Sequence, residues 1–150
     1  MDVCLINPPE ILRVWAGIPK AHAHGVYCFP PLGLMYLQAA VEKRSNYRVE
    51  IIDPVVDNLS YIEFEEMLKK QPLDFVGIGV YTHSLPDVQM TINLVLKLNP
   101  KATIVIGGPH CAMFPEYAMG LKGIDAMVTG DGEESFLEMI QNYDNGKDFS

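Results

Sequence analysis

The sequence predicts an α/β protein, built as a doubly wound parallel sheet with helices on both of its faces. Three observations lead to this prediction. Five short runs are apolar at nearly every position, which is typical of strands that are covered on both sides. Stretches with helical periodicity separate these runs, so strands and helices alternate along the chain. The length of 150 residues suits one domain, and a hydrophobic content of 49% is enough for a buried core.

The predicted strands are rich in β-branched residues and lie between turn-forming residues. They are residues 3–7, 48–53, 75–81, 103–107 and 126–129. Because a helical stretch separates each strand from the next, the strands are expected to be joined by crossovers and to run parallel. The flavodoxin-like order 2-1-3-4-5 is preferred over a longer Rossmann order.

Each predicted helix has one apolar face and recognisable ends. The residues that share a face are Leu34, Leu37 and Val41; Phe64, Met67 and Leu68; Val88, Ile92, Val95 and Leu96; and Phe136, Leu137, Ile140 and Tyr143. Ser60 with Glu63 forms a capping-box pattern, and Ser84 with Asp87 is a looser version of the same signal. The third helix is expected to end at Asn99-Pro100 and the last helix at Asn145-Gly146.

Charge and cysteine content exclude several classes of protein. The net charge is -8, and a protein that binds the phosphate backbone of nucleic acids needs clustered Lys and Arg. Cys4, Cys28 and Cys111 are too few and too scattered for a disulfide framework or a zinc site. No apolar run approaches the ~18 residues of a membrane span, and no charged signal region precedes the first strand. We therefore expect a reduced, cytoplasmic protein without nucleic-acid or membrane partners.

The connection from Pro8 to Pro31 is much longer than the ~2–6 residues that usually join a strand to a helix in such folds. It carries Trp15, His22, His24, Tyr27 and Cys28. Connections of this length often form a functional lid or a binding loop, and a flexible insertion is the alternative.

Polar and glycine-rich segments follow the predicted strands, at the edge where doubly wound sheets bind ligands. They are Asn7-Pro8-Pro9, Asp53-Pro54, Tyr81-Thr82-His83-Ser84, Gly107-Gly108-Pro109-His110 and Gly130-Asp131-Gly132-Glu133-Glu134. Glycine lacks a Cβ, so the two glycine-containing loops would let a bulky ligand reach backbone N–H groups. The alternative is that these glycines only form tight turns.

Single residues at this edge leave alternatives open. Gly77 and Gly79 share one face of the third strand, where they either open a slot for a flat group or let a helix pack closely. His83 and His110 lie on the rim, meaning the carboxyl edge of the predicted sheet. A histidine in such a place more often makes a hydrogen bond within the protein than binds a ligand. Asp53 either binds a ribose hydroxyl or caps the turn before Pro54.

Common catalytic and nucleotide-binding motifs are missing from the sequence. Gly77-Ile78-Gly79 lies inside a strand, so it is no dinucleotide fingerprint, and there is no Walker motif. Asn7-Pro8-Pro9 stands where a receiver domain would carry an acidic pair and where a flavodoxin would carry its phosphate loop. No serine, cysteine or histidine arrangement forms a nucleophile site. The chain is therefore expected to bind a ligand and to hold no catalytic residue and no metal ligand.

Several motifs occur together in a fixed order: Asn7-Pro8-Pro9, Pro30-Pro31-Leu32-Gly33-Leu34-Met35-Tyr36-Leu37, Asp53, Val76-Gly77-Ile78-Gly79-Val80-Tyr81-Thr82, Gly107-Gly108-Pro109-His110 with Pro115-Glu116, and Gly130-Asp131-Gly132-Glu133. Over about residues 2–140 this combination resembles the N-terminal cobalamin-binding domain of cobalamin-dependent radical S-adenosylmethionine (SAM) enzymes. That group includes anaerobic magnesium-protoporphyrin monomethyl ester cyclases and methyltransferases of unactivated carbon.

The resemblance implies a Rossmann-like domain over residues 1–145 that holds cobalamin at the carboxyl ends of its strands. The implied cofactor contacts are Asn7, Pro8, Tyr81, Thr82, His83, Ser84, Gly107, Gly108, Pro109, His110, Gly130, Asp131, Gly132 and Glu133. Among them, Thr82 and Ser84 would bond the nucleotide tail. The sequence lacks the Asp-x-His-x-x-Gly motif by which many cobalamin domains supply a histidine to cobalt. The implied form is therefore base-off, without a histidine from that motif.

The resemblance also implies chemistry outside this sequence. Such enzymes bind a [4Fe-4S] cluster through a Cys-x3-Cys-x2-Cys motif in a following barrel domain, and no cysteines here have that spacing. Residues 146–150 are then expected to begin a linker to a radical SAM domain. The parent would be a methyltransferase or a tetrapyrrole cyclase that also uses S-adenosylmethionine, and this fragment would not be catalytic alone. A domain of the same architecture that binds no cofactor, and serves in substrate or partner-domain contacts, is the alternative.

Overall fold

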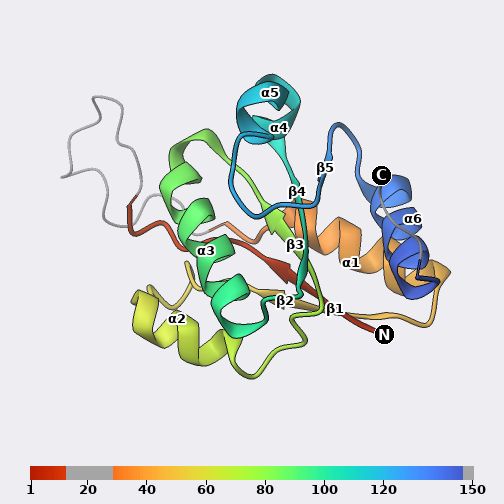
Figure 1. Cartoon of the computed structure of the whole chain (residues 1–150), viewed down its shortest axis with the longest axis horizontal. Helices are drawn as coiled ribbons and strands as arrows, with labels where there is room; N and C mark the ends of the chain where they lie inside the picture. Colours follow the sequence, from red (N-terminus) through yellow and green to blue (C-terminus); the bar gives the residue numbers. More distant parts are fainter. Residues whose placement is uncertain (13–28, 147–150) are drawn as a thin grey trace.

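The computed structural model describes residues 1–12 and 29–146 and has a five-stranded parallel sheet at its centre (Figure 1). The strands are β1 (Asp2–Ile6), β2 (Arg48–Ile52), β3 (Phe75–Gly79), β4 (Thr103–Gly107) and β5 (Ala126–Val128). Their order in the sheet is β2-β1-β3-β4-β5, with every neighbouring pair parallel. The predicted fold and strand order are confirmed, and the predicted strand ends differ from the observed ones by at most two residues.

Helices cover both faces of the sheet. They are α1 (Leu32–Arg44), α2 (Tyr61–Leu68), α3 (Leu85–Leu98), α4 (Pro109–Met113), α5 (Pro115–Ala118) and α6 (Glu133–Asp144), and a 3-10 turn, η2 (Thr82–Ser84), precedes α3. α1 and α6 lie on one face, and α2 and α3 lie on the other (Figure 1). The sequence predicts one helical stretch between β4 and β5, and the structure has two short helices there, α4 and α5.

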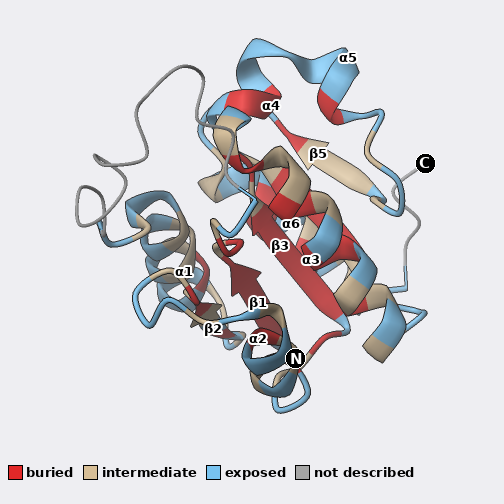
Figure 2. Cartoon of the chain, turned by 90° about the vertical axis from the view of Figure 1, so that its left-hand side faces the viewer, coloured by how far each residue is buried: buried red, intermediate tan, exposed pale blue. Residues whose placement is uncertain are grey.

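The sheet separates two hydrophobic cores. Along β1, Val3 and Leu5 point into the core beneath α1 and α6, whereas Cys4 and Ile6 point into the core beneath α2 and α3. Figure 2 shows the central strands as a largely buried layer between the helices. Because both faces are covered, residues of either parity must be apolar, which explains the continuous apolar runs in the sequence.

The two predicted helix caps have different outcomes. The capping box at α2 is confirmed, because the Ser60 hydroxyl accepts a hydrogen bond from the Glu63 amide and the Glu63 carboxylate accepts one from the Ser60 amide. The cap predicted at Ser84 is wrong. The Ser84 hydroxyl donates to the carbonyl of Tyr81 at 3.1 Å, because η2 turns the chain back on itself just before α3. The helix ends predicted at Asn99 and Asn145 are confirmed.

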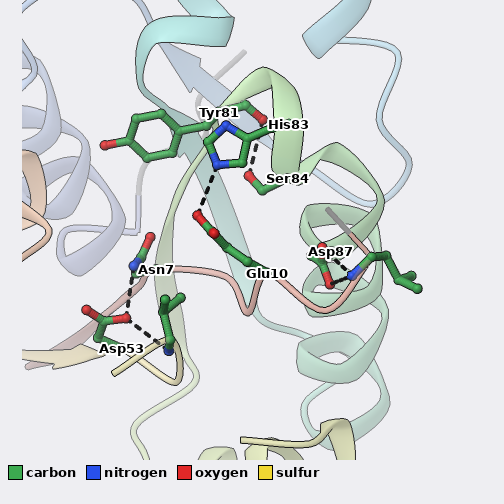
Figure 3. A network of polar contacts seen from close by, with 9 residues as sticks. Asn7, Glu10, Asp53, Tyr81, His83, Ser84 and Asp87 are labelled. Atoms are coloured by element: carbon green, nitrogen blue, oxygen red, sulfur yellow. Dashed lines mark hydrogen bonds and ion pairs between the residues drawn. The ribbon is translucent and has the colours of Figure 1, made fainter. Parts of the chain in front are cut away.

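A buried carboxylate anchors the start of the long connection between β1 and α1 (Figure 3). Asp87, in the first turn of α3, has no exposed surface. Its two carboxylate oxygens accept hydrogen bonds from the Leu12 amide at 3.1 and 3.0 Å, and the Tyr61 hydroxyl donates to one of them. Burial and the contact with Asp87 raise the pKa of the Tyr61 hydroxyl, so it remains a donor at neutral pH.

Other predictions fall partly outside the described residues. Trp15, His22, His24, Tyr27 and Cys28 all lie in the segment 13–28, so the predicted lid or binding loop stays a prediction. Residues 147–150, which include most of the predicted linker, are also outside. Within the described ranges, no helix combines the length and apolar character that a membrane crossing requires.

Candidate functional site

A cavity of about 360 Å³ lies at the carboxyl edge of the sheet. It is bordered by the ends of the central strands and by α1 and α6, which cover one face of the sheet. Gly79 of β3 and Gly107 of β4 are register partners and form part of its floor. Leu34 of α1 and Phe136 of α6 belong to its apolar walls. The volume is near the low end of the ~300–1,000 Å³ of small-molecule sites, so a large ligand could place only a part of itself inside.

Bare backbone keeps this cavity open. A Cβ on Gly79 would come no closer than 3.8 Å to another atom, the Cδ2 of Leu34, and one on Gly107 no closer than 3.5 Å. A Cβ on Gly130 would meet nothing within 4 Å. A Cβ on Gly79 or Gly107 would therefore fit without displacing the protein around it, whereas the φ of 79° at Gly130 disfavours any side chain there. These glycines leave room for a ligand.

The structure separates the two glycines of β3. A Cβ on Gly77 would lie 2.6 Å from the Cδ2 of Leu5 and 3.0 Å from the Phe136 ring. Gly77 thus permits close packing of α6 on the sheet, which was one of the two open alternatives. Gly79, two residues further along β3, faces the cavity. This position agrees with the other alternative, a slot that is open to a ligand.

We expect Gly77→Ala to lower the free energy of unfolding by about 1–3 kcal/mol, because the added methyl group overpacks the contact with Leu5 and Phe136. The matched variant Gly79→Ala should change it by less than about 0.5 kcal/mol, because its methyl group enters free space. Urea denaturation followed by circular dichroism measures both. Equal destabilisation by the two substitutions would contradict the packing role of Gly77.

Many of the residues expected to contact a ligand line the cavity. They are Asn7, Tyr81, Gly107, Gly108, Pro109, Gly130, Asp131, Gly132 and Glu133. Gly108 has a φ of 117°, and a Cβ there would lie 2.9 Å from the Val80 carbonyl oxygen, so this turn requires glycine. The apolar wall residues Leu34, Leu37, Val128 and Phe136 were not predicted as site residues. The hydrophobic periodicity of the sequence identifies these residues only as core positions. It does not show which core positions border a cavity.

The other predicted contacts lie outside the cavity lining, and some are occupied within the protein. Pro8 is buried, and the buried Ser84 uses its hydroxyl in the bond to Tyr81. His110 is 3% exposed, and its Nδ1 lies 3.0 Å from the Oγ1 of Thr82. Among the described residues its Nε2 has no hydrogen-bond partner. Thr82 is an exposed residue, whereas Ser84, the other residue predicted to bond the tail, is buried.

The rim between β1 and β3 carries a polar network (Figure 3). The Nε2 atom of His83 lies 3.0 Å from the Oε1 of Glu10, and the His83 ring stacks on Tyr81 with centroids 5.7 Å apart. Asp53 accepts a hydrogen bond from the Asn7 amide group at 2.9 Å and one from the Val55 backbone at 3.2 Å. The turn-capping alternative for Asp53 is thus the one that the structure shows.

Neither a metal-binding cluster nor a reactive thiol is found among the described residues. In the described ranges no three His, Cys, Asp or Glu side chains are grouped so that they could hold a metal ion. Burial raises the pKa of the Cys4 thiol to about 12 and that of the Cys111 thiol to about 11, so neither supplies a thiolate nucleophile at neutral pH. What remains is an apolar cavity with a backbone floor and a polar, exposed rim.

Comparison with known proteins identifies relatives that are much longer than this chain. An uncharacterized methyltransferase of Pyrococcus horikoshii is 34% identical over 120 residues, which are 79% of this chain and 26% of the relative. The anaerobic magnesium-protoporphyrin IX monomethyl ester cyclase of Rubrivivax gelatinosus is 26% identical over 140 residues, 91% of this chain and 25% of the relative. The chain thus spans about a quarter of the length of these relatives.

A solved structure shows the same fold. The radical S-adenosylmethionine methyltransferase TsrM of Kitasatospora setae, with cobalamin and a [4Fe-4S] cluster bound, superposes with a TM-score of 0.79 at 20% identity. The match covers 99% of this chain and 27% of TsrM. The family profile of the B12 binding domain matches residues 21–140, which is most of the chain and agrees with the resemblance found in the rim motifs. This chain belongs to the B12-binding domain family.

Proposed function

We propose that this chain is the cobalamin-binding domain of a longer radical SAM enzyme, a methyltransferase or a tetrapyrrole ring cyclase. The glycine-floored cavity at the carboxyl edge of a B12-binding domain is the observation that carries the proposal. The names of the relatives support the reaction classes, and the larger size of those relatives supports a partner domain in the same chain.

The shape of the site suits cobalamin. This cofactor combines a broad, flat corrin ring with a narrower nucleotide tail, and a cavity of about 360 Å³ is too small for the ring with its substituents. We infer that the tail enters the cavity and that the ring lies across the exposed rim near Tyr81 and Gly108. A tail held in the cavity keeps its base away from cobalt, so the bound form is base-off.

Different residues of the chain would contact different parts of the nucleotide tail. Leu34 and Phe136 would shield the base of the tail from water, and Gly79 and Gly107 would let it lie against the backbone. Thr82, an exposed residue whose hydroxyl also contacts Nδ1 of His110, would place this hydroxyl beside the tail. Bound cobalamin supplies a cobalt centre that can carry a methyl group, while the cluster and S-adenosylmethionine would bind in the radical SAM domain. In this proposal the domain binds the cofactor and would supply no catalytic group itself. A cytoplasmic location is part of the proposal, supported by the free thiols of Cys4 and Cys111.

Mixing the purified chain with hydroxocobalamin tests the proposal. We expect a coloured species that stays with the protein on gel filtration and has a base-off absorption spectrum. Cobinamide, which lacks the nucleotide tail, should bind more weakly because it leaves the cavity empty. Free elution of the corrin would contradict the proposal and favour a domain of this architecture that binds no cofactor.

A further inference from the structure

His83 is held at the carboxyl edge of the sheet in a defined orientation (Figure 3). It belongs to η2, directly after β3, and its ring stacks at an interplanar angle of 25° on Tyr81, which lines the cavity. Its side chain is 33% exposed, so a bound molecule on the rim could reach it. The Nε2 edge of the ring faces Glu10, on the segment that follows β1.

The contact with Glu10 decides which ring nitrogen is available. A neutral histidine whose Nε2–H donates to the Glu10 carboxylate, 3.0 Å away, carries its lone pair on Nδ1. Within the described part of the chain, Nδ1 has no hydrogen-bond partner. Metal-bound histidines commonly donate their second ring N–H to a carboxylate in this way, which fixes the tautomer and makes the ligating nitrogen more basic.

Glu10 is itself held in place. The amide of Leu12, two residues further along, is bonded to both carboxylate oxygens of the buried Asp87. Asp87 belongs to α3, the helix that begins at Leu85, two residues after His83. The two sides of the His83–Glu10 contact are therefore fixed to one rigid element, which preorganises the imidazole.

A corrin needs little from the protein to complete its metal centre. Its ring supplies four nitrogens to cobalt, so one axial ligand is enough and no cluster of protein ligands is required. Within the described ranges the other imidazole and the thiols are unsuitable ligands. His110 is buried and bonded to Thr82, and Cys4 and Cys111 are buried thiols.

We propose that His83 provides an axial ligand, through Nδ1, to the cobalt of the cobalamin bound by this domain. This assignment rests on the proposed function and extends it, because the Asp-x-His-x-x-Gly motif that supplies such a ligand elsewhere is missing from this sequence. The ligand would come from the segment after the third strand, and Glu10, after the first strand, would act as the positioning residue.

Electron paramagnetic resonance of the chain loaded with cob(II)alamin tests the assignment. The protein is labelled uniformly with ¹⁵N and the cofactor is unlabelled. Coordination by a protein nitrogen is expected to split the cobalt lines into doublets, whereas the cofactor's own base would give triplets and a centre without axial nitrogen would give no such splitting. The doublets should disappear in His83→Phe, which keeps the ring stacking on Tyr81, and should remain in the control variants His22→Gln and His24→Gln.

The outcomes separate the two levels of the proposal. Corrin that is retained without doublets, or doublets that persist in His83→Phe, would overturn the ligand assignment and leave cobalamin binding intact. Corrin that is not retained by the unaltered chain would overturn the proposed function, and the ligand assignment with it.

Discussion

Replacing Gly79 by leucine is expected to abolish cobalamin retention while the domain stays folded. The first carbon of the new side chain fits, because the nearest atom to a Cβ at this position is 3.8 Å away. The rest of the side chain then occupies the cavity between Leu34 and the end of β4, where the nucleotide tail is proposed to lie. We expect the Kd for cobalamin to rise at least about a hundredfold, equivalent to about 2.8 kcal/mol. Equilibrium dialysis with detection of corrin absorbance measures it.

Two controls make this result specific. Ala39→Leu adds comparable bulk on an exposed position of α1 outside the cavity and should leave the Kd unchanged. Cobinamide has no tail to displace, so its affinity should differ little between the Gly79→Leu variant and the unaltered chain. Normal cobalamin binding by a folded Gly79→Leu variant would show that the tail lies elsewhere.

Asp87→Asn should be the most destabilising substitution of an acidic residue in the described part of the chain, lowering the free energy of unfolding by about 3 kcal/mol. The Asp87 carboxylate has no exposed surface and accepts from the Leu12 amide through both oxygens, and from the Tyr61 hydroxyl. An asparagine presents an N–H₂ group to one of these donors, so one hydrogen bond becomes a repulsive contact. Urea denaturation followed by tryptophan fluorescence and circular dichroism measures the loss.

Asp57→Asn is the matched control, because Asp57 is exposed and the same change of charge should alter the free energy of unfolding by less than about 0.5 kcal/mol. Tyr61→Phe removes one of the donors, and its effect should not add to that of Asp87→Asn, because both substitutions break the same hydrogen bond. Similar stabilities of the Asp87→Asn and Asp57→Asn variants would show that the buried carboxylate does not hold the connection in place.

Local patterns were sufficient for the elements and their order. The strands of a doubly wound sheet are covered on both faces, so they have a continuous apolar signature that is visible in sequence. The Ser60–Glu63 box was predictable because both partners lie within one turn of a helix. The similar pattern at Ser84 was misleading, because the partners that Asp87 meets, Leu12 and Tyr61, come from distant segments.

The sequence alone determined the α/β class, the strand order, the edge of the sheet at which the site lies, and the glycine-rich loops that border it. Only the tertiary structure decided the roles of individual residues there. Gly77 and Gly79 look alike in sequence, yet Phe136 of α6 packs on the first and leaves the second open. His83 and His110 are both rim histidines in sequence, yet α4 buries one and the rim exposes the other. Hydrophobic periodicity is a property of neighbours along the chain, whereas these differences depend on where remote helices and loops cross the sheet.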